Sequence, residues 1–203
     1  MSFNTANLAV GRVITGFSLP YVALYTANGP TVTYSNGRRL ARGVDVDVSP
    51  EFSEDNTFYA DNGAAESDVG TLTGGTLALT VDGLFTEAER LITALPAARQ
   101  DGWTPDGDRA HPFVGTGFVI EWQSNGVVFY QPMVVAKVQF KTPKTTAKTR
   151  EKEKDYQTTP LEGKILRDDT AEHNWRYLGD DFATEAEAEA ALKEFLNISG
   201  GNT

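Results

Sequence analysis

Apolar and polar side chains alternate along several short stretches of the chain. Valines alternate strictly with aspartates over residues 44–48, and apolar residues alternate with small or polar ones over residues 77–82. A period of two places the apolar side chains on one face of a β-strand and the polar ones on the other. Residues 113–123 and 127–140 are rich in β-branched and aromatic side chains, which are typical of strands. The pattern predicts antiparallel β-sheet as the main framework.

Tight turns are marked by the dipeptide Asn-Gly, which occurs four times, at residues 28–29, 36–37, 62–63 and 125–126. Both residues tolerate the positive φ angles of two-residue hairpin turns. Together with the alternating stretches, these turns predict a mainly β fold. We expect an antiparallel β-sandwich or open barrel with one or two packed α-helices.

Two capping boxes predict the helices. Thr86 with Glu89, and Thr184 with Glu187, have the spacing at which a hydroxyl and a carboxylate cap a helix N-terminus. Apolar side chains follow each box at helical spacing. The second box predicts a short C-terminal helix over about residues 185–197.

Length and composition limit the remaining possibilities. We expect a single domain over residues 1–203, because a chain of this length fits one hydrophobic core. The absence of cysteine excludes disulfides, thiolate zinc sites and cysteine nucleophiles. Residues 1–20 have no basic start and no continuous apolar run, and no stretch of the chain is apolar enough to span a bilayer. We therefore expect neither a signal peptide nor membrane insertion.

Several motifs occur in an order that resembles a known family. Residues 44–51 read Val-Asp-Val-Asp-Val-Ser-Pro-Glu, and residues 58–63 read Phe-Tyr-Ala-Asp-Asn-Gly. Residues 73–89 run from Thr-Gly-Gly-Thr through an alternating strand into Leu-Phe-Thr-Glu-Ala-Glu, and residues 156–163 read Tyr-Gln-Thr-Thr-Pro-Leu-Glu-Gly. In this order, over residues 40–166, the chain resembles the major tail proteins that form the tail tube of long, flexible-tailed bacteriophages.

The resemblance implies a structural protein of the virion. Its copies would form homohexameric rings that stack into the tail tube, the conduit through which DNA is ejected into the host. The implied partners are further copies of the chain, the tape-measure and tail-terminator proteins, and phage DNA that passes through the lumen without sequence-specific binding. The implied location is the virion tail, after assembly in the host cytoplasm.

The charges are arranged in blocks. The formal net charge of −10 argues against a duplex-binding surface, which requires a dominant basic face. Residues 1–44 carry four arginines and no acidic side chain, residues 45–110 carry fourteen acidic and three basic side chains, and residues 137–164 carry eight basic and four acidic ones. Such blocks can meet between copies of the chain, in which case added salt would weaken assembly. Alternatively, they neutralise one another within one copy or keep it soluble.

The most basic segment covers residues 141–155 and has almost no apolar side chains. Its candidate contact residues are the basic ones: Lys141, Lys144, Lys148, Arg150, Lys152 and Lys154. The segment cannot offset its own ordering entropy. We predict an inter-ring arm that orders on contact with the next ring, where the acidic residues 45–68 of another copy provide the complement. The alternative is a solvated loop that joins two strands.

Three carboxylates in the alternating region are candidate lumen-facing residues: Asp45, Asp47 and Glu51. A channel wall with the same sign of charge as the phosphate backbone cannot bind DNA tightly and stall it. The alternative is a half-exposed strand on the outer wall of the tube.

Residues that could carry catalysis or bind a metal are few. His111 and His173 have neither metal-ligand spacing nor a serine elbow nearby. Adjacent carboxylates such as Asp168 and Asp169 could serve acid-base chemistry or bind calcium, but without a pocket they usually form a solvated face. We expect no enzymatic activity, no metal site and no cofactor.

Two other functions are compatible with the sequence. A tail-completion or neck protein, or the subunit of a phage-like secretion tube, would form one ring or need a partner. A carbohydrate-binding β-sandwich module would be a monomer that binds glycans through tryptophans, of which the chain has Trp103, Trp122 and Trp175.

Overall fold

The computed structural model of the chain describes residues 11–54, 56–60, 63–68, 70–149 and 157–198. Over these residues the protein is mainly β, with antiparallel strands and two helices. In chain order the elements are β1 (Val13–Asn28), β2 (Thr31–Arg39), β3 (Gly43–Phe52), β4 (Asn56–Ala60), β5 (Gly63–Asp68), β6 (Leu72–Val81), α1 (Thr86–Thr93), β7 (Val114–Ser124), β8 (Val127–Phe140), β9 (Thr159–Leu166), β10 (Arg176–Leu178) and α2 (Glu185–Phe195).

Most strands belong to one curled sheet. Seven of them follow the order β2-β1-β7-β8-β9-β6-β3, and β10 joins the sheet beside β8. The sheet curls far enough to bring β1 against β3. A Cβ on Gly43 of β3 would lie only 2.2 Å from the ring of Phe17 of β1. The arrangement is an open barrel with few helices, and the predicted fold class is confirmed.

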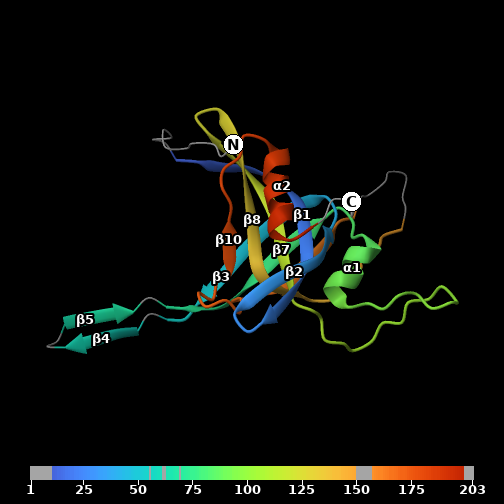
Figure 1. Cartoon of the computed structure of the whole chain (residues 1–203), viewed down its shortest axis with the longest axis horizontal. Helices are drawn as coiled ribbons and strands as arrows, with labels where there is room; N and C mark the ends of the chain where they lie inside the picture. The colour runs from blue at the N-terminus through green and yellow to red at the C-terminus, as the bar shows by residue number, and fades with distance from the viewer. Residues whose placement is uncertain (1–10, 55, 61–62, 69, 150–156, 199–203) are drawn as a thin grey trace.

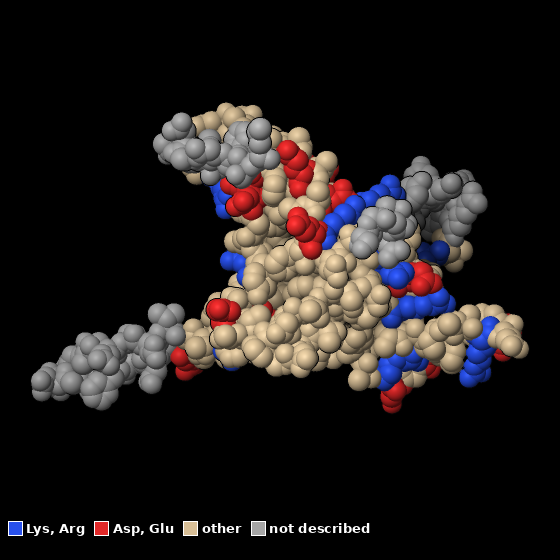
Figure 2. Space-filling view, in the orientation of Figure 1, with Lys and Arg blue, Asp and Glu red and all other residues tan. Residues whose placement is uncertain are grey.

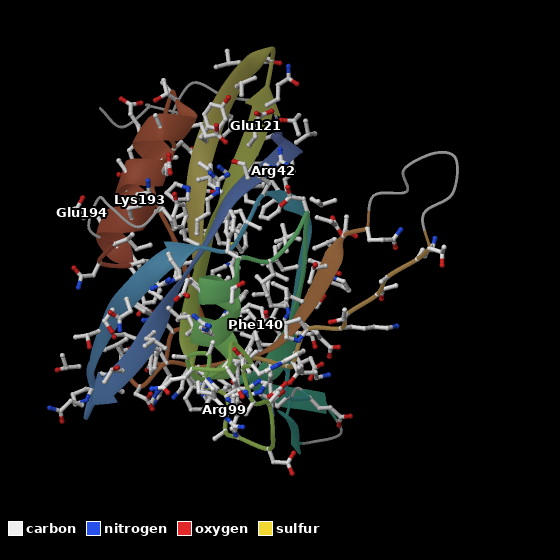
Figure 3. All side chains as sticks on the ribbon, turned by 90° about the vertical axis from the view of Figure 1, so that its right-hand side faces the viewer. Arg42, Arg99, Glu121, Phe140, Lys193 and Glu194 are labelled. Carbon is white, nitrogen blue, oxygen red and sulfur yellow. The ribbon has the colours of Figure 1, made fainter. Side chains whose placement is uncertain are left out.

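The inner face of the curled sheet holds the larger apolar core. Phe118 and Phe140 are buried there, together with the inward side chains of β6 and β9. α1 closes this core with Ala88 and Ile92, which are fully buried. Figure 3 shows α1 lying between the two sides of the curled sheet.

The start of α1 differs from the prediction. Phe85 is the N-cap residue and no side chain caps the helix, so Thr86 already belongs to its first turn. The predicted capping box of Thr86 with Glu89 is therefore wrong. The helix ends at Thr93, because Ala94 adopts a left-handed conformation with φ 56°.

α2 covers part of the outer face of the sheet. Thr184 is its N-cap and its Oγ1 accepts a hydrogen bond from the Glu187 backbone N–H at 3.3 Å, so the predicted start is confirmed. Ala188 and Leu192 are buried against the outward side chains of β1, β7 and β8. The helix approaches closely because β7 carries Gly117 there, where a Cβ would lie 2.4 Å from the Leu192 Cδ1.

Three of the four Asn-Gly pairs lie at hairpin connections, as predicted: between β1 and β2, β4 and β5, and β7 and β8. Gly29 and Gly126 supply the positive φ angles, 59° and 79°. The hairpin predicted at the remaining pair is wrong, since Asn36 and Gly37 lie inside β2. Gly37 instead makes room for the residues that follow α2, because a Cβ at position 37 would lie 2.3 Å from the Ile198 side chain.

Candidate functional site

The outer surface of the curled sheet has two halves that differ in their cover. We call the outward faces of β1, β2, β7 and β8, over which α2 lies, the covered half. We call the outward faces of β3, β6 and β9 the open half. Among the described elements, neither helix packs on the open half. In Figure 3, α2 lies outside one side of the sheet, whereas side chains of β9 and β6 project outward without cover on the other side.

The open half has a polar surface because of strand alternation. Val46 and Val48 pack on the inner core, so the aspartates between and before them point outward. Three rows of paired residues cross this face from β3 through β6 to β9: Asp45–Thr80–Pro160, Asp47–Ala78–Glu162 and Ser49–Thr76–Lys164. The face therefore combines small and polar side chains with carboxylates.

The three candidate lumen residues share this outward face. Asp45, Asp47 and Glu51 are all exposed on β3. The Oγ of Ser49 donates a hydrogen bond to Asp47 Oδ1 at 3.0 Å. One departure from the predicted alternation occurs at Val44, which falls at a shift of register and is 55% exposed. Whether these carboxylates line a channel stays a prediction.

The net charge of the open half is negative. Its exposed acidic side chains are Asp45, Asp47, Glu51 and Glu162, and its exposed basic ones are Lys164 and, at the end of β8, Lys141. Lys141 forms an ion pair with Glu162. Lys164 has no described ion pair. The four carboxylates outnumber the two ammonium groups, so the net charge of this face is negative.

A polar network fastens the segment between β9 and β10 to the sheet. Asp169 accepts a hydrogen bond from the Tyr25 hydroxyl at 2.6 Å and forms an ion pair with Lys137 at 2.6 Å. The Lys137 ammonium also lies over the rings of Tyr25 and Phe113, 4.9 and 4.8 Å from their centroids. The hydrogen bond from Lys137 and, after it, that from Tyr25 lower the pKa of Asp169 below its ordinary value.

Asp168 contributes a buried part of the same network. Its side chain is 2% exposed and accepts hydrogen bonds from the hydroxyls of Thr170 and Tyr177, each at 2.6 Å. The expectation of a solvated carboxylate is wrong for Asp168, which is buried, whereas Asp169 is exposed as expected. No local sequence pattern indicates this network, because its tyrosines and its lysine come from distant strands.

The hairpin of β4 and β5 projects away from the body of the protein. The two strands pair with each other and with no other described strand, and Figure 1 shows them extending outward beyond β3 and β6. We call residues 51–70, which include this hairpin, the acidic arm. Their sequence contains six acidic side chains and no basic one, together with Phe52, Phe58 and Tyr59. A two-stranded hairpin is at best marginally stable alone in water.

The predicted basic arm leaves the sheet at the end of β8. Residues 141–149 form no helix or strand, and Lys141, Lys144 and Lys148 are exposed. Arg150, Lys152 and Lys154 lie outside the described residues. We call residues 141–149 the basic loop. Contact between this loop and another ring stays a prediction.

The histidines and tryptophans have local roles in the described part of the chain. His111 Nδ1 lies 2.6 Å from the Phe140 carbonyl oxygen, and His173 Nδ1 lies 3.3 Å from that of Asp168. Trp122 and Trp175 pack against the inner core, and Trp103 is 77% exposed in the loop after α1.

The described residues contain no group of three or more His, Asp or Glu side chains arranged to hold a metal ion. Neither helix in the part of the chain covered by the structure is long and apolar enough to cross a membrane. Comparison with protein-family models and with curated proteins gives no match for the chain.

Proposed function

We propose that the protein is a structural subunit whose copies assemble into stacked, hexameric rings that form the tail tube of a bacteriophage. The open half of each subunit lines the channel through which DNA is ejected. The observation that carries the proposal is this uncovered, carboxylate-bearing sheet face on a subunit that also bears a projecting hairpin.

The chemistry of the open half suits a conduit for DNA. Threonines and an alanine on β6 offer a wall of small and polar side chains. The carboxylates on β3 repel phosphates of the same sign, so the polymer slides past without being held. Base recognition would need basic or amide side chains directed at base edges, and such a set is not part of this face as described. The proposed role is therefore structural rather than enzymatic.

The acidic arm and the basic loop supply the contacts that such a subunit needs with its neighbours. Both extend from the sheet, and they carry opposite charge. In this proposal the end surfaces of the finished tube bind the tape-measure and tail-terminator proteins.

Electron microscopy of the purified protein tests the proposal. At raised protein concentration in 0.1 M salt we expect hollow tubes of uniform width. In 1 M salt, where the Debye length falls from about 10 Å to about 3 Å, the tubes should shorten or dissociate. Rings that never stack would favour the tail-completion or neck alternative. A protein that stays monomeric at every concentration and salt would contradict the proposal.

A further inference from the structure

A cleft of about 600 Å³ lies where the start of α1 meets the connection from β2 to β3. Its lining comes from four parts of the chain and includes Tyr21, Arg39, Arg42, Asp82, Phe85 and Glu189. Figure 1 shows α1, which begins at this cleft, on the side of the molecule away from the acidic arm.

The cleft offers an exposed aromatic ring beside two arginines, together with the carboxylates of Asp82 and Glu189. The Phe85 side chain is 60% exposed. Arg42 uses its Nε to bind Asp82 at 2.5 Å, but its side chain is 83% exposed and its terminal amino groups bind no other described residue. Arg39 forms no ion pair with another described residue, and its Nε donates to the Ala41 carbonyl oxygen.

The acidic arm has matching chemistry. It carries only acidic charges, and its aromatic residue nearest the body, Phe52, is 55% exposed. Glu51 and Glu54 are exposed beside Phe52. In Figure 2 the Lys and Arg side chains gather mainly on the side away from the arm, and acidic side chains are the more prominent charged ones at the base of the arm.

We infer that the cleft receives the acidic arm of a second copy of the chain. This inference rests on the proposed self-assembly and names its contact. Carboxylates of the arm pair with Arg39 and Arg42, and its aromatic side chains pack on Phe85. Because arm and cleft lie on opposite sides of one subunit, the contact is head-to-tail and repeats from copy to copy.

The length of the arm is sufficient for such a contact. Residues 53–60, which lead outward along one side of the hairpin, span about 25 Å at the usual rise of a strand. Packing against a neighbouring copy would give the hairpin the additional contact that an isolated two-stranded ribbon lacks. The competing acceptor for the same carboxylates is the basic loop of the neighbour, and the experiment distinguishes the two.

A charge-swap experiment tests the pairing. The cleft variant combines Arg39→Glu with Arg42→Glu, and the arm variant is Glu54→Arg, which leaves the candidate channel residues of β3 unchanged. Each variant alone brings like charges together, so the critical concentration for tube formation should rise about tenfold or more. An equimolar mixture should assemble normally, because each arm then meets a cleft of opposite charge. A single chain that carries all three substitutions should also assemble.

Two controls separate docking from folding and from general charge effects. Arg99→Glu reverses one arginine on the loop after α1, which Figure 3 places well away from Arg42, and should leave assembly unchanged. Phe85→Ala alters no charge and should still raise the critical concentration. The thermal midpoint of each variant establishes that the subunit is folded.

The possible failures are distinguishable. If wild-type protein forms tubes but the cleft variant assembles like wild type, the cleft inference is overturned and the proposed function stands. A variant of the basic loop combines Lys144→Glu with Lys148→Glu. If the arm variant assembles when mixed with this loop variant but not when mixed with the cleft variant, the cleft inference is likewise overturned and the proposed function stands. If wild-type protein forms no tubes at all, the proposed function fails first.

Discussion

The covered and open halves of the sheet come from the same alternation of side chains, yet only one of them is packed. On the covered half, β7 presents Gly115 and Gly117 outward, and small residues let α2 approach. No charged side chain occurs between Arg12 and Arg38, and Figure 2 shows an uncharged surface over β1 and β2. On the open half, carboxylates alternate with small polar residues. The difference shows that outward side chains decide whether a helix covers a strand.

The largest effect on stability should come from weakening the packing of α2 on the covered half. Leu192→Ala removes a fully buried side chain of α2 and leaves a cavity against β7, so the free energy of unfolding should fall by about 3 kcal/mol. Urea denaturation measures the change. The matched substitution on the open half, Ala78→Ser at an exposed position, should change stability by less than about 0.5 kcal/mol. Equal losses in the two variants would remove the distinction between the halves.

An intermediate effect should come from the network at Asp169. Asp169→Asn weakens the contacts to Tyr25 and Lys137, and because the carboxylate is 45% exposed we expect a loss of only about 1 kcal/mol at pH 7. The folded-state pKa of Asp169 is lowered, so its stabilisation is present above the unfolded pKa of about 4 and is lost as pH falls through the folded pKa. Wild type and variant should therefore converge once the pH has fallen below the folded-state pKa of Asp169. A difference in stability that persists there would rule out the carboxylate as its source.

The smallest effect on stability should come from reversing charge on the open half. Asp45→Lys with Asp47→Lys changes exposed side chains, so the free energy of unfolding should shift by less than about 0.5 kcal/mol each. Assembled tubes of this variant should retain duplex DNA at low salt and release it at high salt, unlike wild-type tubes. Gel filtration of tubes mixed with DNA measures retention. Equal retention by both proteins would separate these aspartates from the channel.

The sequence predicted features that depend on local patterns. The strands around residues 44–48 and 77–82, the turn at Gly126 and the cap at Thr184 follow from alternation, positive φ and hydroxyl capping. The prediction failed at Thr86, where the chain turns into a helix one position early and Phe85 occupies the cap without a side-chain hydrogen bond.

Features that depend on distant partners were not predictable. The burial of Asp168 requires Tyr177 and Thr170 to converge on it, and the ion pair of Asp169 requires Lys137 from another strand. For the acidic arm, the Asn-Gly pair at residues 62–63 indicated a hairpin. No local pattern states whether a hairpin packs on the body or projects from it, so the projection came only from the structure.

The orientation of the open half in an assembled tube is the most direct test of the account. The chain has no cysteine, so Ala78→Cys on the open half and Glu194→Cys on the exposed side of α2 each introduce a single thiol. In unassembled subunits both thiols should react with a maleimide that carries a long polyethylene glycol chain. In tubes, the account predicts that the thiol at position 194 still reacts with this bulky reagent, while that at position 78 reacts only with a small maleimide. Full reaction of the bulky reagent at position 78 in intact tubes, or protection at position 194 instead, would contradict the account.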